Sequence, residues 1–257
     1  METNAVRLRV HLAPVGFEVL RVIEPMKILH ADVALLLTFS QTDRARFHVE
    51  KIMHGLKESR IQAQVIECNI WSTSEVVNEV GSIVTASPQH DYLFNVSTGT
   101  RTAGIAGVIA GMFWRVLPYY VAVDDQAKPV HSEQDFPLRG FPQFVPTFEI
   151  PLLDEATVAA LEYIAGKQEP IPKRLLLSHL KDNGVVGPRQ KRTVSPQALH
   201  GQVDSILHKL ETWGFVDLVG RRKLMRVRIT DKGIEGRKMF FHMLNPRKPL
   251  PVLTART

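Results

Sequence analysis

Short apolar runs that alternate with helical patterns constrain the fold of this chain more than any other feature. The apolar runs are typical of buried strands and cover residues 6–12, 33–39, 64–68, 92–96 and 117–123. Helical patterns separate them at residues 17–29, 42–59, 74–86 and 102–114. Strands joined through helices form right-handed crossovers and a mostly parallel sheet with both faces covered. The sequence therefore predicts a Rossmann-like α/β domain over residues 1–123.

Two loops of this domain are predicted to lie together at its ligand-binding edge. With strand order 3-2-1-4-5, the order reverses between the first and fourth strands, and ligands of such sheets bind beyond the carboxyl ends of the strands at that point. The loops there are "HLAPVGFE" at residues 11–18 and "NVSTGTR" at residues 95–101. The helix after the second loop carries Gly104, Gly107 and Gly111, which predict its close approach to the sheet or to a neighbouring helix.

The second loop has a chemistry suited to phosphate. Gly99 permits a tight turn, Arg101 adds a planar positive charge, and the helix that follows presents unpaired amides. Hydroxyl donors and acceptors come from Ser97, Thr98, Thr100 and Thr102. A hydroxyl that only caps the helix is the structural alternative. The patterns G-x-G-x-x-G and G-x-x-x-x-G-K-[ST] do not occur in these loops, so NAD and ATP are disfavoured as substrates.

The rest of the chain is predicted to form a connector and a second domain. Prolines recur through residues 124–151 and predict an extended connector, with one added strand near residues 144–150. Residues 152–257 carry helical patterns at 153–166, 172–182, 195–213 and 232–244, and a hairpin pattern at 215–219 and 224–229. Three helices followed by a hairpin predict a mainly α winged helix-turn-helix domain.

The two halves of the chain differ in charge. Residues 1–150 hold 13 Lys and Arg against 16 Asp and Glu, a net charge of −3, whereas residues 151–257 hold 19 against 10, a net charge of +9. Such asymmetry points to a polyanion, here double-stranded DNA, as the partner of the second half alone. A basic solvated surface without a partner is the alternative.

The helix at residues 195–213 predicts how this half would contact DNA. One side of the helix is apolar and faces the core: Leu199, Val203, Ile206, Leu207 and Leu210. The opposite side is polar, as a recognition helix in the major groove requires, and basic clusters before the helix and at the hairpin tip can hold phosphates. The predicted DNA-contacting residues are Arg189, Lys191, Arg192, Ser195, Gln197, Gly201, Ser205, His208, Arg221, Arg222 and Lys223.

Several classes of site and location are disfavoured by the sequence. Cys68 is the single cysteine, cannot form an internal disulfide and is predicted to be a core thiol. His200 and His208 are eight residues apart on one helix, too far to act as paired metal ligands, so no metal or cofactor is predicted. Without an apolar run of about 18 residues or a signal-peptide pattern, the sequence predicts a cytoplasmic protein with no membrane partner.

The two loops and the order of the domains resemble a known combination. The Gly-Phe pair in "HLAPVGFE" and the stretch "FNVSTGTRTAG" are similar to the two ligand loops of the CARF family, the CRISPR-associated Rossmann fold. That family often carries a C-terminal winged helix. The resemblance implies that Gly16, Phe17 and Asn95 join the ligand-binding residues of the second loop. It also implies a homodimer that binds cyclic oligoadenylate, commonly the tetramer, across its axis, in a prokaryotic, archaeal-type regulator linked to CRISPR defence.

Three interpretations of function compete. In the first, the chain is a ligand-responsive transcription regulator. In the second, it is a metal-independent ring nuclease that degrades cyclic oligoadenylate; Arg101, Ser97 or Thr98 would stabilise charge there, and His11 is the nearest general base, although strand-end packing explains His11 as well. In the third, the Rossmann-like half is only a dimerisation scaffold. No carboxylate-lysine motif follows the winged helix, so the regulator is favoured and no catalytic residue is assigned.

Overall fold

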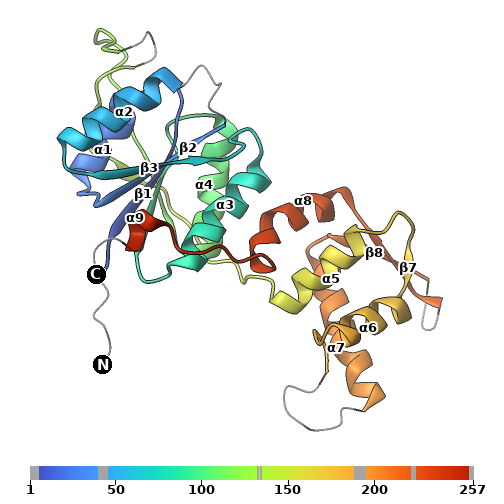
Figure 1. The fold of residues 1–257 in the computed structure, drawn as a ribbon. Helices are drawn as coiled ribbons and strands as arrows, with labels where there is room; N and C mark the ends of the chain where they lie inside the picture. Colours follow the sequence, from blue (N-terminus) through green and yellow to red (C-terminus); the bar gives the residue numbers. More distant parts are fainter. Residues whose placement is uncertain are drawn as a thin grey trace. The chain divides into compact units, whose positions relative to one another are not determined.

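The structure of the chain is a computed structural model that describes residues 6–39, 46–131, 133, 135–187, 195–220 and 224–254. Its contacts divide the chain into two compact units (Figure 1). Unit 1 comprises Met1–Pro151 together with Pro246–Thr257, and unit 2 comprises Leu152–Asn245. The sequence had placed residues 246–257 with the second domain; they belong instead with unit 1, so the chain crosses between the units twice.

Unit 1 is built on a mostly parallel, six-stranded sheet. The strands are β1 (Arg9–Pro14), β2 (Val33–Thr38), β3 (Gln62–Glu67), β4 (Asp91–Asn95), β5 (Leu117–Tyr120) and β6 (Gln143–Phe144). Their order is β3-β2-β1-β4-β5-β6, with every pair parallel except β5 and β6. The predicted order of the first five strands is therefore confirmed, and the fold of this unit is Rossmann-like.

Helices cover both faces of this sheet (Figure 1). On one side lie α1 (Leu20–Ile28) and α2 (Arg46–Glu58), and on the other lie α3 (Thr73–Ala86) and α4 (Arg101–Trp114). A strand covered on both faces has no solvent side, and all six residues of β2 are buried accordingly.

The elements differ from the prediction mainly at their ends. β1 runs from residue 9 to 14 instead of 6 to 12, and β5 ends at Tyr120 instead of residue 123. The added strand covers only Gln143–Phe144, and the final long helix breaks into α8 (Asp231–Phe240) and the short η2 (Phe241–Met243). None of these shifts moves a strand to another place in the sheet.

The last segment of the chain packs on unit 1. Arg247 forms an ion pair with Glu79 of α3, and the short helix α9 (Pro251–Thr254) lies against β3. Leu250 and Leu253 are buried. The segment thus covers apolar surface as well as making the ion pair.

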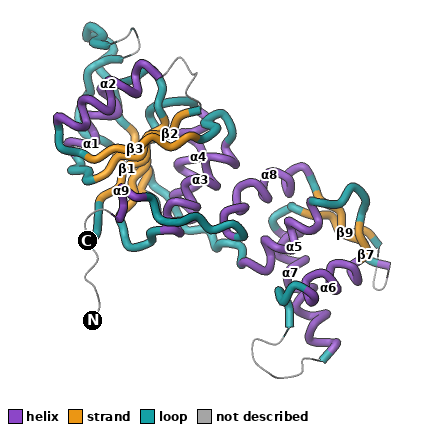
Figure 2. Tube along the Cα trace, in the orientation of Figure 1, coloured by secondary structure: helices purple, strands orange, loops and turns teal. Residues whose placement is uncertain are grey.

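Unit 2 combines helices with a small antiparallel sheet (Figure 2). Before α8, its elements in chain order are α5 (Glu155–Ala165), β7 (Ile171–Pro172), α6 (Lys173–Asp182), α7 (Pro196–Thr212), β8 (Val216–Val219) and β9 (Arg226–Ile229). The sheet has the order β7-β9-β8. Asp154, Ser195 and Thr230 cap α5, α7 and α8 through their side chains, as their positions before the helical patterns indicate.

No helix in the described ranges is both long and apolar enough to cross a membrane. Within the same ranges, no group of three or more His, Cys, Asp or Glu is arranged to hold a metal ion.

Candidate functional site

The two predicted ligand loops meet where the strand order reverses. β1 pairs with β2 on one side and β4 on the other, so the loops after β1 and β4 leave adjacent strands at the same edge. A Cβ built on Gly16 would lie 3.1 Å from both the Cα and the amide nitrogen of Gly99. Gly99 has φ +71°, and a Cβ there would lie 2.6 Å from the Cβ of Pro14. The loops therefore interlock backbone to backbone, and neither glycine has room for a side chain.

Asn95 joins the second loop to helix α1. Its fully buried side chain donates from Nδ2 to the carbonyl of Arg21 at 2.7 Å. Pro25 lies four residues after Arg21 within α1 and has no amide hydrogen to donate to that carbonyl. Asn95 thus supplies the hydrogen bond that the helix lacks. The proline inside α1 thus marks an attachment point for the loop.

Ser97 fixes the same loop to the end of β5. Its amide and hydroxyl donate to Oδ1 of Asn95 at 3.0 and 2.5 Å, and its hydroxyl accepts from the amide of Val121 at 3.1 Å. Asn95 and Ser97, both predicted ligand-binding residues, therefore have their polar atoms engaged within the protein. They hold the loop in shape, which is a positioning role.

The two threonines on either side of Gly99 differ in their surroundings. Thr100 caps α4, because its hydroxyl accepts from the amide of Ala103 at 3.0 Å, and it also donates to the carbonyl of Ile70. Thr98 is only 2% exposed, and its hydroxyl has no hydrogen-bond partner among the described residues. A buried hydroxyl without a partner is costly, so the Thr98 hydroxyl is a group that a ligand could satisfy.

The N-terminus of α4 is open to solvent. Arg101 is its first residue and is exposed, while Thr102 is half-buried. Among the described residues, no acceptor engages the amides of these two residues or the guanidinium of Arg101. Unpaired amides at the positive end of a helix dipole, beside an arginine, form a favourable place for a phosphate.

The glycines of α4 let the helix lie against the sheet, as predicted. A Cβ on Gly104 would lie 2.7 Å from the carbonyl oxygen of Val96, and one on Gly107 would overlap the ring of Phe94. The close approach places the helix N-terminus beside the loop after β4. On the other side of α4, Ile105 is exposed.

The first loop brings an aromatic ring and a carboxylate to the site. Phe17 is exposed and packs edge to face on His48, with 5.4 Å between ring centroids. Glu18, which was not among the predicted site residues, has Oε2 buried without a hydrogen-bond partner in the described part of the chain.

Asp135 was not among the predicted site residues either. It accepts from the amide of Leu20 at 2.9 Å and caps α1 from the connector, and burial raises its pKa. No local pattern marks a cap supplied from such a distance in sequence.

His11 does not lie where a general base would be useful. It sits within β1 instead of at the strand end, is fully buried, and has Nδ1 3.3 Å from the hydroxyl of Tyr119. Burial lowers the pKa of His11 to about 3, so the ring is neutral. The packing explanation of His11 therefore holds.

Cys68 is buried as predicted, and burial raises the pKa of its thiol to about 12.

The second candidate surface is the outer face of α7 in unit 2. Gln197, Gly201, Ser205 and His208 are exposed on it. On the opposite side Val203, Ile206, Leu207 and Leu210 are buried, and Leu199 is half-buried. Nothing lies within 4 Å of a Cβ built on Gly201. The helix thus presents the polar face that its periodicity predicted.

Carboxylates accompany several basic groups of this surface. Lys173 pairs with Asp204 of α7, Lys209 pairs with Asp154, and Arg228 of β9 pairs with Asp217 at 2.8 Å. The hydroxyl of Ser195 accepts from the amide of Ala198 at 3.3 Å and serves as the cap. The other predicted DNA-contacting residues, Arg189, Lys191, Arg192, Arg221, Arg222 and Lys223, lie outside the described residues.

Comparisons with known proteins add a family match to unit 1. Residues 9–126 match a family described as "HFX_2341_N:-like, N-terminal", which is less than half of the chain. No curated protein matches this sequence.

Three solved structures with a likeness to the chain are remote from it in sequence. Can2 from Sulfobacillus thermosulfidooxidans in complex with cyclic tetra-adenylate is 10% identical, with TM-score 0.39 and coverage of 90% of this chain and 63% of that chain. A type III CRISPR defence DNA nuclease activated by cyclic oligoadenylate is 13% identical, with TM-score 0.40 and coverage of 80% and 34%. Enterococcus italicus Csm6 bound to cyclic hexa-2′-fluoro-hexa-dAMP is 9% identical, with TM-score 0.37 and coverage of 80% and 56%. The chain spans less than two thirds of each of these proteins, and the fold assignment rests on its own strand order.

Proposed function

We propose that the chain is a homodimeric, ligand-responsive DNA-binding regulator of the CARF type, linked to CRISPR defence. Its first unit would bind a cyclic oligoadenylate, with the tetramer as the first candidate, and its second unit would bind double-stranded DNA as a winged helix-turn-helix. The resemblance of the loops around Gly16 and Gly99 to the CARF ligand loops names the ligand class.

One observation carries the ligand part of this proposal. Two interlocked loops, the open N-terminus of α4, the exposed Arg101 and the unpartnered hydroxyl of Thr98 converge at the point where the strand order reverses. Each feature suits a phosphate-bearing ligand, and ligands of parallel α/β sheets bind at this point. If the second loop served only to cap α4, the hydroxyl of Thr100 would be sufficient.

The dimer part rests on α4. Its glycines face the sheet, which leaves an outer stripe with Ile105 exposed and Ile109 and Met112 half-buried. An apolar stripe beside the site suits a two-fold contact that would double the site. A cyclic ligand with matching symmetry would then meet Arg101 of each chain once.

Calorimetry with cyclic tetra-adenylate, and then with cyclic hexa-adenylate, tests the ligand. We expect binding at one ring per two chains. Arg101→Ala should weaken it by about 1.5–3 kcal/mol for each of the two chains around the ring, because each chain loses a hydrogen bond to a charged phosphate. Lys57→Ala is the control, since Lys57 is an exposed charge in the last turn of α2, which leads into the opposite end of the sheet.

The outcomes separate the three interpretations. Binding without cleavage supports the sensor. Linear products from the same incubation would assign the chain to the ring nucleases. If neither ring binds to folded protein, the nucleotide proposal fails and the scaffold interpretation takes its place.

The salt dependence of the affinity for DNA tests the proposed DNA-binding function. Arg221→Ala together with Arg222→Ala should weaken binding to all sequences and lower the slope of log K against log salt by roughly 2 for each bound chain, because about one counterion is released per phosphate contact. Lys238→Ala is the control, since it removes a charge from α8 that pairs with Glu235. Equal affinity of parent and double variant at every salt concentration would contradict the docking.

A further inference from the structure

A third loop adjoins the candidate ligand site. Residues 68–72 connect β3 to α3, and the carbonyl of Ile70 accepts a hydrogen bond from the hydroxyl of Thr100, the cap of α4. α3 and α4 also pack side by side. No sequence pattern marks this loop, and it follows a strand that is not a neighbour of β4 in the sheet.

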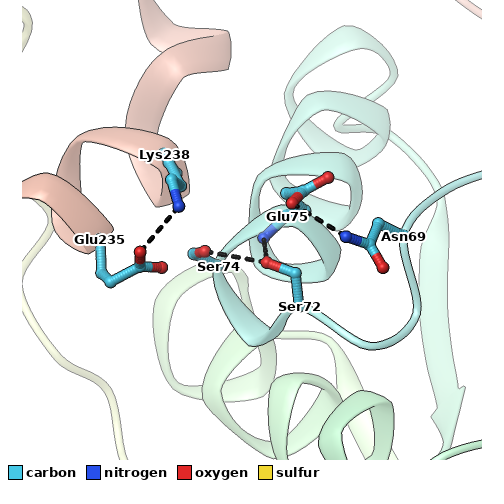
Figure 3. A network of polar contacts seen from close by, with 6 residues as sticks. All are labelled: Asn69, Ser72, Ser74, Glu75, Glu235 and Lys238. Atoms are coloured by element: carbon cyan, nitrogen blue, oxygen red, sulfur yellow. Dashed lines mark hydrogen bonds and ion pairs between the residues drawn. The ribbon is translucent and has the colours of Figure 1, made fainter.

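Hydrogen bonds fix the shape of the third loop (Figure 3). Nδ2 of Asn69 donates to Glu75 at 3.1 Å, and Oδ1 of Asn69 accepts from the amide of Trp71 at 3.2 Å. The hydroxyl of Ser72 accepts from the amide of Glu75 at 3.3 Å and caps α3. The backbone on both sides of Trp71 is therefore held in place.

Trp71 leaves most of its ring in solvent. The residue is 65% exposed, whereas its neighbour Ile70 is buried. No aromatic ring or cation among the described residues stacks on the indole. A large apolar ring on a rigid backbone beside a site is the arrangement with which proteins stack nucleobases.

We propose that Trp71 is a base-stacking residue of the candidate site and makes that site selective for purine rings over pyrimidine rings. The inference rests on the proposed nucleotide-binding function. Trp71 follows Ile70, and Arg101 follows Thr100. The hydrogen bond between Ile70 and Thr100 therefore brings these two exposed residues together at the same edge of the candidate site. The guanidinium suits the phosphate of a nucleotide and the indole suits its base. Larger purine rings cover more of an indole than pyrimidines do.

Calorimetry with two ligands measures the stacking. Cyclic tetra-adenylate should bind the parent more tightly than cyclic tetra-uridylate does. Trp71→Ala should weaken adenylate binding by about 5- to 150-fold for each stacked base that is lost, one from each of the two chains around the ring, and should bring the two affinities together. Trp71→Phe should keep most of the affinity and of the preference, since it keeps a ring. Phe141→Ala, which removes another exposed aromatic at 78% exposure, should change neither.

Failure of this inference is distinct from failure of the proposed function. If the parent binds cyclic tetra-adenylate and Trp71→Ala binds it equally well, with the same preference over the uridylate ring, Trp71 does not stack a base and the sensor proposal stands. If the parent binds neither ring, both proposals fall. Circular dichroism of each variant verifies that the fold is kept, and Trp71→Leu, which has an apolar side chain without a ring, takes the place of Trp71→Ala if that variant does not fold.

Discussion

Replacing Gly99 by valine is expected to abolish binding of cyclic tetra-adenylate. The backbone at Gly99 has φ +71°, which a β-branched residue adopts only with strain. Its Cβ would also lie 2.6 Å from the Cβ and 3.1 Å from the carbonyl oxygen of Pro14. Pro14 is the last residue of β1, so it cannot move away from the new side chain at position 99 without displacing the first loop. The substitution should therefore push the two loops apart, and calorimetry of the variant should show no heat of binding.

A matched variant separates the two causes. Gly140 has φ +78°, but nothing lies within 4 Å of a Cβ built there. Gly140→Val thus introduces a similar backbone strain without a collision and should keep the ligand affinity. Urea denaturation should show a larger loss of stability for Gly99→Val than for Gly140→Val. Gly99→Ala is the milder substitution if the valine variant does not fold. Normal ligand binding by folded Gly99→Val would mean that the interlocked loops are not the site.

The order of the sheet could be predicted because it depends on features spread along the whole first half of the chain. Alternation of apolar runs with helices requires parallel strands, and the handedness of the crossovers leaves few orders open. The positions of the two ligand loops then follow from the strand order alone, since each loop begins where a strand ends. Their contact through Gly16 and Gly99 is the consequence in three dimensions.

The partners within the site could not be predicted in the same way. Asp135 caps α1 across 115 residues of sequence, and Asn95 reaches Arg21 across 74. A connector that is rich in proline gives no signal that one of its aspartates will be buried. The third loop could not be placed beside the second from strand order, because the two adjoin through the hydrogen bond between Ile70 and Thr100 and the packing of α3 on α4.

The faces of α7 were predictable for a simpler reason. A helix repeats every 3.6 residues, so the side that carries Val203, Ile206 and Leu210 must be the buried one. The carboxylate partners of its basic neighbours were not foreseen, because Lys173 and Asp204 come from different helices. Each of these pairs is neutral, so the net positive charge of the second half comes from basic residues outside them.

Asn95→Leu is expected to destabilise unit 1 by about 3–5 kcal/mol. The leucine keeps the volume but leaves the carbonyl of Arg21 and the amide and hydroxyl of Ser97 without their partner, and each of these three partly buried groups costs about 1–1.5 kcal/mol when it loses that partner. Urea denaturation followed by circular dichroism measures the change from the midpoint and slope. A loss below about 1 kcal/mol would contradict the central position given to this side chain.

The link between Asn95 and the proline in α1 can be measured separately. Pro25→Ala restores an amide that can donate to the carbonyl of Arg21, so Asn95→Leu should cost about 1 kcal/mol less in that background than in the parent. Pro88→Ala provides the control, because Pro88 is an exposed residue between α3 and β4, and its effect should add to that of Asn95→Leu without coupling. Equal coupling for Pro25 and Pro88 would show that Asn95 does not replace the missing helical hydrogen bond. Coupling confined to Pro25 would show that the proline in α1 and the buried side-chain amide at the end of β4 act as one unit, which holds the second loop where Gly99 can meet Gly16.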